Sequence, residues 1–167
     1  MFTRSFRIFA ASFAVVLLTT TALAWAAGGR SETGLRRVGQ TTIVSETALR
    51  RLKANKGVSV QWLWGSKPGP LQVIETPEGV RLVGHQGPTK HGSLEIDGFV
   101  ERIDTSDFTF RGRIVIVDAY EPTTPPCVRE GRVTFRIRLQ RPYWRMKEQA
   151  AQCAGRSNIA DYVDIQF

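Results

Sequence analysis

Arginine recurs at alternate positions in two stretches of the sequence, and this spacing is typical of one face of a β-strand. The first stretch is RGR at residues 111–113, and the second is RVTFRIR at residues 132–138. Alternate side chains of a strand point to the same side. If the two strands pair in antiparallel fashion, they collect five arginines on one face: Arg111, Arg113, Arg132, Arg136 and Arg138.

This arginine face predicts the binding of an anion. Like charges on neighbouring strands repel each other unless a group of opposite charge lies over them. A guanidinium group donates paired hydrogen bonds to carboxylate or phosphate oxygens. We therefore predict a non-catalytic binding module for an anionic glycan, a lipid head group or the surface of another envelope protein. The alternative is that acidic residues on neighbouring strands neutralise the arginines. The acidic candidates are Glu95, Asp97, Glu101 and Asp164.

Two tryptophans offer a different kind of site. In GVSVQWLWG, Val58, Val60, Trp62 and Trp64 occupy alternate positions, so they share one side of a predicted strand. The two indole rings either belong to the core or form an aromatic wall around a small apolar ligand inside a barrel. The sequence leaves both interpretations open.

No spacing pattern of a common catalytic centre occurs in the sequence. It has no nucleophile elbow, no His-Glu-x-x-His and no glycine-rich phosphate or dinucleotide loop. Two pairs of carboxylates, Glu95 with Asp97 and Asp161 with Asp164, offer acid–base chemistry in principle. Acids this close together along a strand are more typical of a solvated or ion-paired face. We therefore expect a protein that is not an enzyme and has no cofactor, with a hydrolase as the less favoured alternative.

The cysteines and histidines indicate a structural disulfide and no metal centre. An even count of two cysteines in an oxidising compartment predicts one disulfide, between Cys127 and Cys153. The only histidines, His85 and His91, lie in one loop at a spacing without regular metal-binding geometry. We expect no metal site.

The first 26 residues are typical of an export signal. Arg4 and Arg7 precede an apolar run over residues 8–24, and Ala24-Trp25-Ala26 offers small residues for cleavage after Ala26 or after Ala24. Removal of this segment lowers the formal net charge from +8 to +6. We expect a secreted protein of the periplasm or the extracellular space. After cleavage it would not be an integral membrane protein, and nucleic acid would not be its ligand.

Three successive strands between residues 93 and 139 form the centre of the predicted fold. They are SLEIDGFVERID, DFTFRGRIVIV and EGRVTFRIRL, and each alternates apolar and polar residues between turn-forming residues. The alternation changes phase around Gly98, which predicts a β-bulge of the kind that bends a sheet or lets it close.

Shorter elements surround these strands. Residues 27–42 show no periodicity and predict a flexible segment. Ser45 is a good N-cap for a short helix with an apolar stripe of Ala48, Leu49 and Leu52. Further strands are predicted at LQVIE, VRLVG and the final ADYVDIQF.

A second helix is predicted after Pro142, which suits a first helical turn. Tyr143, Met146, Ala150 and Cys153 follow at helical spacing. The predicted fold is therefore all-β: residues 43–167 form a single, small antiparallel β-barrel-like domain with one N-terminal helix and one short helix before the last strand.

Several segments resemble those of a family of small exported bacterial proteins of uncharacterised function. They are FTFRGRI at residues 108–114, PCVREG at 126–131, RPYWRMKE at 141–148, Cys153 and the terminal DYVDIQF. The resemblance covers most of the chain after the signal and is weakest before Val58. It implies one compact exported domain and assigns neither an activity nor catalytic residues.

Overall fold

The computed structural model describes residues 35–63, 67–119, 125–150 and 160–167. Ser31–Phe167 form one compact unit that contains every described element. The predicted export signal lies outside the described residues. No described helix is long and apolar enough to cross a membrane. The described elements are β1 (Arg36–Val38), β2 (Thr41–Ile43), α1 (Glu46–Lys53), β3 (Gly57–Val60), β4 (Leu71–Thr76), β5 (Gly79–Thr89), β6 (Gly92–Ile103), β7 (Asp107–Asp118), β8 (Cys127–Ile137), β9 (Tyr143–Met146) and β10 (Val163–Gln166).

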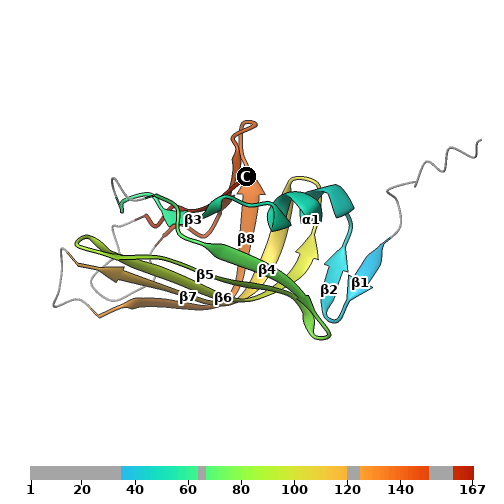
Figure 1. The fold of residues 1–167 in the computed structure, drawn as a ribbon, viewed down its shortest axis with the longest axis horizontal. Coiled ribbons are helices and arrows are strands. Elements are labelled where there is room, and N and C mark those ends of the chain that lie inside the picture. Colours follow the sequence, from blue (N-terminus) through green and yellow to red (C-terminus); the bar gives the residue numbers. More distant parts are fainter. Residues whose placement is uncertain (1–34, 64–66, 120–124, 151–159) are drawn as a thin grey trace, which may run out of the picture. The chain divides into compact units, whose positions relative to one another are not determined.

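The strands form one large mixed sheet, drawn in Figure 1. The three central strands were predicted correctly, and β5 to β10 pair with their neighbours in antiparallel fashion, with β3 beside β10. The all-β prediction is confirmed, but the sheet is not closed into a barrel. β3 is four residues long and pairs with β10, and beyond that pairing it forms one isolated bridge, Val58 with Gly69, just before β4.

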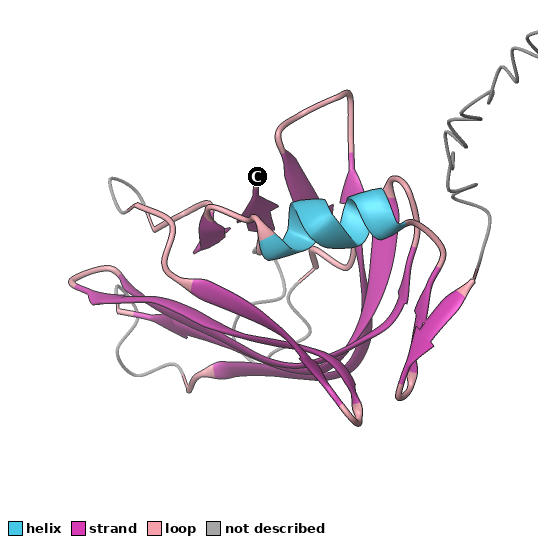
Figure 2. Ribbon diagram, turned by 45° about the vertical axis from the view of Figure 1, so that its right-hand side comes forward, coloured by secondary structure: helices cyan, strands magenta, loops and turns pink. Residues whose placement is uncertain are grey.

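The helix α1 lies over the concave side of the bent sheet, as Figure 2 shows. Buried residues of α1 and of the strands form one core cluster. Phe108 stacks on Phe135 with ring centroids 4.9 Å apart, and Trp144 meets the edge of Phe108 at 5.8 Å. All three side chains are fully buried. The interior of the sheet is therefore filled by aromatic rings that pack on each other.

The helix forms where the capping pattern predicted it. The Ser45 hydroxyl accepts the backbone N–H of Ala48 at 3.2 Å. The predicted apolar stripe is buried: Ala48, Leu49 and Leu52 are each at most 2 % exposed. Local capping chemistry and a narrow apolar face are enough to fix this element.

Two glycines face each other in the middle of β6 and β7. Gly98 is paired with Gly112, and Gly112 is paired with Gly131 of β8. A Cβ atom at Gly98 would lie 2.6 Å from the Gly112 Cα and 2.7 Å from the Phe110 ring. Real Cβ atoms do not approach other atoms this closely, so both strands require glycine at this crossing.

The β-bulge lies three residues beyond its predicted position. The register of β6 against β7 is regular through Gly98 and shifts between Val100 and Arg102, with Glu101 as the extra residue. Because of this extra residue, Val100 and Ile103 both point into the core. The change of phase in the sequence is real, but its assignment to Gly98 was wrong. Gly98 stays in register because it has no Cβ to hold β7 away.

The predicted second helix is wrong over the residues that the structure describes. Tyr143–Met146 form β9, a strand that pairs with β8 on one side and β10 on the other. The three-residue spacing of Tyr143 and Met146 had suggested a helix, but Trp144 and Met146 are both buried, as alternate residues of a strand are. Backbone pairing on both edges decides for the strand. The end of the predicted helix, residues 151–153, lies outside the described residues.

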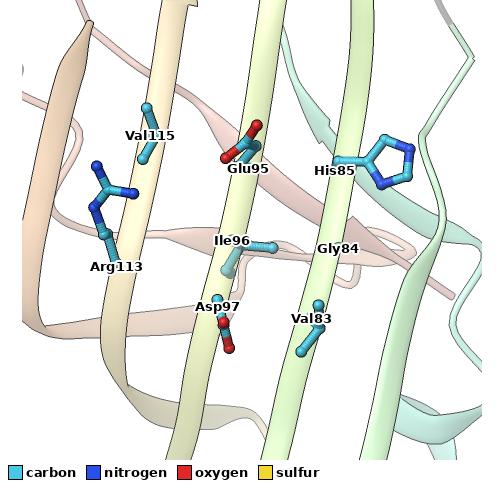
Figure 3. A pocket seen from close by; sticks show the side chains of 8 residues that line it. All are labelled: Val83, Gly84, His85, Glu95, Ile96, Asp97, Arg113 and Val115. Atoms are coloured by element: carbon cyan, nitrogen blue, oxygen red, sulfur yellow. The ribbon is translucent and has the colours of Figure 1, made fainter.

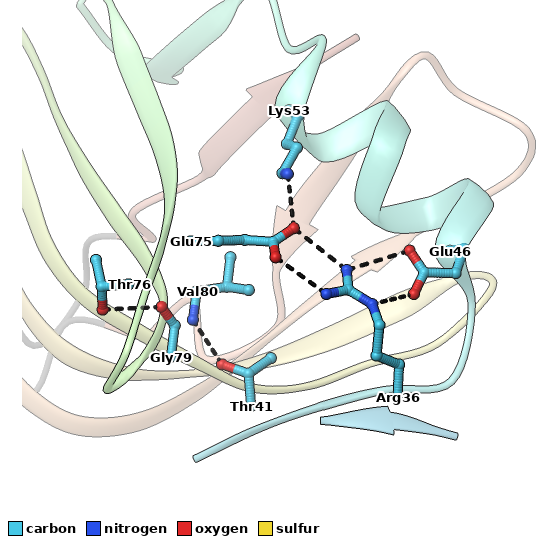
Figure 4. Close-up of polar contacts among 8 residues, drawn as sticks. All are labelled: Arg36, Thr41, Glu46, Lys53, Glu75, Thr76, Gly79 and Val80. Carbon is cyan, nitrogen blue, oxygen red and sulfur yellow. Dashed lines mark hydrogen bonds and ion pairs between the residues drawn. The ribbon is translucent and has the colours of Figure 1, made fainter. Parts of the chain in front are cut away.

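The predicted flexible segment also needs correction, because its last residues form β1 and the start of β2. The Thr41 hydroxyl donates to the Val100 carbonyl and accepts the Val80 N–H at 2.8 Å. Arg36 binds two carboxylates, Glu46 of α1 and Glu75 of β4 (Figure 4). These side-chain contacts from distant elements hold a segment that has no periodicity of its own.

Gly98→Ala is expected to lower the free energy of unfolding by about 2–3 kcal/mol, because the new methyl group meets β7 backbone and a buried ring. Gly131→Ala is the matched comparison. Gly131 has φ +113°, yet nothing lies within 4 Å of an added Cβ, so its cost is backbone strain alone, about 1 kcal/mol. Denaturant unfolding measures both variants. Equal losses would contradict the steric role of Gly98.

Glu75 predicts a measurable pH dependence. Hydrogen bonds from Arg36 and Lys53 lower the pKa of Glu75 from 4.5 to about 2. A lowered folded-state pKa stabilises the fold above the unfolded value, and this contribution is lost as the pH falls through the folded value. Between pH 4.5 and pH 2, stability should therefore fall less steeply in Glu75→Gln than in the parent protein. Glu95→Gln, at an exposed position without an ion pair in the described residues, should leave the slope unchanged.

Candidate functional site

The structure places the predicted arginines on the outer face of the sheet, away from the core. Arg111 of β7 lies directly opposite Arg132 of β8. Together with Arg113 and Arg136, their side chains are 47–60 % exposed. Arg138 follows the last residue of β8 and lines the same pocket as Arg136. Strand pairing therefore brings the five arginines to one face, as their spacing predicted.

Three carboxylates pair with four of these arginines. Glu101, the extra residue of the bulge, accepts hydrogen bonds from both Arg111 and Arg132 at 2.5 Å. These hydrogen bonds, from Arg132 and then Arg111, lower the pKa of Glu101. Glu101 thus offsets the repulsion between the two arginines that the register places opposite each other.

Arg113 and Arg136 pair with carboxylates that were not among the predicted acidic candidates. Arg113 pairs with Glu130 at 3.5 Å, and Arg136 pairs with Asp107 at 2.9 Å. In both cases the acid is the residue directly opposite on the neighbouring strand. The middle of the arginine face is therefore close to electrically neutral.

Positive charge remains at the β8–β9 end of this face. A pocket of about 210 Å³ opens there, and we call it the basic pocket. Four of its lining side chains are cationic. The residues that line it are Arg136, Arg138, Arg145, Met146, Lys147 and Gln149.

Two of the four cations of the basic pocket pair with carboxylates: Arg136 pairs with Asp107, and Arg145 pairs with Asp164. Arg138 and Lys147 have no ion pair in the described parts of the chain. The nearby Glu148 carboxylate accepts the backbone N–H of Thr134 at 2.9 Å. The pocket thus keeps two cationic groups whose donors are available to a ligand.

Arg145 is the most firmly held cation of the basic pocket. Its Nε and Nη2 atoms donate to the two oxygens of Asp164 at 2.7 and 2.6 Å. The rings of Tyr143 and Tyr162 lie 4.9 and 4.7 Å from its guanidinium carbon. Burial raises the pKa of Asp164, and the hydrogen bonds from Arg145 oppose this rise. The pair is 10–14 % exposed, so each charge depends on the other.

Arg145 and Lys147 were not among the predicted site residues, because the spacing of their neighbours predicted a helix. The signal was present in YWRMK, where Tyr143, Arg145 and Lys147 alternate with two apolar residues. An apolar–polar alternation over only five residues does not distinguish a strand from a helix unless the neighbouring strands are known.

A second hollow lies further along the outer face, across β5, β6 and β7 (Figure 3). Its volume is about 430 Å³, and its lining combines apolar residues such as Val83 and Val115 with charged residues of both signs. His85 of β5 and Glu95 of β6 are directly opposite each other in the register, and the His85 ring points away from Glu95 (Figure 3). No cluster of three or more metal-binding side chains occurs among the described residues. The hollow offers mixed charges and no preference for one class of ligand.

The tryptophan site is described only in part. Trp62 follows the end of β3, is half-buried and packs against the core. Its indole N–H donates to Asp161 at 3.1 Å, and the same carboxylate accepts a hydrogen bond from Arg129 at 2.9 Å. Asp161 is fully buried, so this trio ties the residues after β3 to β8 and to the segment before β10. Trp64 lies outside the described residues.

The disulfide prediction also involves a residue that the structure leaves undescribed. Cys127 opens β8, is fully buried and is paired in the register with Ile116. Its predicted partner, Cys153, lies outside the described residues. The disulfide therefore stays a prediction.

Arg145→Met is expected to destabilise the fold by about 3–5 kcal/mol, because it leaves the buried Asp164 carboxylate without its partner. Arg136→Met is the matched comparison. Arg136 is about half exposed, and loss of an exposed ion pair costs about 0–1 kcal/mol. Thermal or denaturant unfolding distinguishes the two. A loss below 1 kcal/mol in Arg145→Met would show that the pair is solvated in solution.

Comparisons with known proteins agree on a family without an assigned activity. The model of the PM1083 family matches residues 40–167. The uncharacterised protein PM1083 of Pasteurella multocida (strain Pm70) is 29 % identical over 109 residues, which cover 65 % of this chain and 69 % of that protein. No solved structure matches significantly. Since the family match runs from the turn before β2 to the last residue, the chain belongs to the PM1083 family, a family of uncharacterised bacterial proteins.

Proposed function

We propose that this protein is a non-catalytic binding module that holds an anionic group in the basic pocket. The observation that carries the proposal is the excess of cations there. Arg136 and Arg145 are fixed by carboxylates, while Arg138 and Lys147 are not. An anion in the pocket would supply the missing negative charge.

The two fixed arginines prepare the pocket for such a ligand. Asp107 and Asp164 each engage Nε and Nη2 of their arginine, which leaves the Nη1 atoms of Arg136 and Arg145 unused by these pairs. A guanidinium that is already oriented loses less conformational freedom when it binds. Phosphate, sulfate and carboxylate groups all suit these donors.

The place of action that we propose is outside the cytoplasm, in the periplasm or the extracellular space. The support is the signal-like leader with its small residues before Ala26, together with the two cysteines. A disulfide between Cys127 and Cys153 would anchor the undescribed segment before β10 to the start of β8. Anionic glycans, lipid head groups and acidic protein surfaces are the ligands that this location offers.

The alternative of an apolar ligand inside the sheet has one observation in its favour. The buried indole N–H of Trp144 has no hydrogen-bond partner in the described residues. However, the Trp144 ring packs against Phe108 and lies 4.5 Å from the ring of Phe167, centroid to centroid. These aromatic contacts occupy the space that an interior ligand would need, so the outer basic pocket is the better candidate.

An amide NMR titration of residues 27–167 tests the proposal, with inorganic phosphate and a sulfated glycan as ligands at two salt concentrations. We expect shifts at Arg138, Arg145 and Lys147 that weaken at high salt, because screening reduces exposed charge interactions. The variant Arg138→Ala/Lys147→Ala should bind at least about tenfold more weakly, a loss of about 1.4 kcal/mol.

Arg113→Gln is the control for this titration, since Arg113 lies on the same face outside the basic pocket and has its own carboxylate. Its binding should match the parent protein. An equal loss in Arg113→Gln would assign binding to the whole arginine face. Amide shifts confined to residues 58–62 and the aromatic core would assign binding to the interior of the sheet. The absence of amide shifts with every anion would overturn the proposal.

A further inference from the structure

The turn between β8 and β9 has a backbone conformation that its two central residues rarely adopt. Leu139 and Gln140 have φ values of 51° and 55°, and the Arg141 N–H closes the turn on the Arg138 carbonyl at 3.1 Å. Two consecutive positive φ angles define a type I′ turn, which strongly favours Asn-Gly. Leucine and glutamine are strained there.

Leu139 is also the most exposed of the large apolar side chains in the described residues, at 87 %. It lies at the tip of the β8–β9 hairpin, which projects beside α1 in Figure 1. Arg138 and Arg141 flank the tip, and the basic pocket begins at Arg138. The guanidinium of Arg141 donates to the hydroxyl of Tyr143 at 2.5 Å. The apolar tip therefore has cationic side chains and a tyrosine next to it.

We infer that this hairpin docks the protein on an anionic phospholipid membrane. Leu139 enters the apolar edge of the bilayer, while Arg138, Arg141 and Lys147 bind lipid phosphates. This inference rests on the proposed function and names its ligand. Clustered cations bind anionic bilayers, and an apolar side chain gains free energy when it leaves water for the bilayer. Tyrosine is typical of the boundary between water and lipid.

The apolar tip favours a membrane over a soluble anion. A free phosphate or a glycan sulfate would use the cations but would leave Leu139 in water. A bilayer satisfies both features at once, because head groups and acyl chains lie within one side-chain length of each other. Membrane binding then gives Leu139 a role at the tip, although leucine is unfavourable in this turn.

Vesicle flotation with residues 27–167 tests the inference. The vesicles contain either equal parts of phosphatidylglycerol and phosphatidylcholine or phosphatidylcholine alone. We expect binding to the anionic vesicles only. Arg138→Ala/Lys147→Ala should bind about 25-fold more weakly, at about fivefold for each basic residue.

The decisive variant is Leu139→Asn/Gln140→Gly, which replaces the apolar tip with the residues that a type I′ turn prefers. It should melt at a higher temperature than the parent protein, bind inorganic phosphate equally well, and bind anionic vesicles about tenfold more weakly. A matched surface change at another site, Ile74→Asn, should leave vesicle binding unchanged, since Ile74 is exposed on β4 away from the hairpin.

The outcomes separate the two proposals. Undiminished vesicle binding by Leu139→Asn/Gln140→Gly would overturn the membrane inference and leave the anion pocket standing. The same holds if phosphate shifts the pocket residues but anionic vesicles do not bind. If neither phosphate nor anionic vesicles bind, both proposals fail.

Discussion

The close approach of β6 and β7 at Gly98 and Gly112 is the constraint on which the rest of the fold depends. At this crossing the Phe110 ring fills the space that a side chain at either position would need. The two glycines and the nearby bulge at Glu101 let long strands bend without losing their pairing. The bend turns the inner faces of the strands toward one aromatic core. It also gives the sheet an outer face that is free to carry charge.

Charge on that outer face is of two kinds. Exposed pairs such as Arg113 with Glu130 contribute little to stability, and their main effect is to neutralise the arginine face. The pair of Arg145 with Asp164 is largely buried and is enclosed by two tyrosine rings, so it fixes one cation in place. The cations that belong to neither kind of pair are left for a ligand. These cations are Arg138 and Lys147, which share the basic pocket with the already oriented Arg136 and Arg145.

Features set by neighbouring residues in the chain were predictable. The helix over residues 46–53 follows from its N-cap and apolar stripe, and β6, β7 and β8 follow from a period of two over many residues. Prediction failed at three short strands. β9 has only four residues, and β1 and β2 have three each, so their periodicity carries little information. These strands exist because longer elements pair with them or bind their side chains.

The candidate site shows the same division. Sequence alone determined that arginines would share a face, because alternation along a strand fixes the direction of each side chain. It could not determine which arginines would be neutral. That depends on the register, which sets Glu130 opposite Arg113 and Asp107 opposite Arg136, and on a bulge that lets one glutamate serve two arginines. Only the tertiary structure brought Arg145 and Lys147 into one pocket with Arg138, because hydrogen bonding between neighbouring strands decides which charges meet.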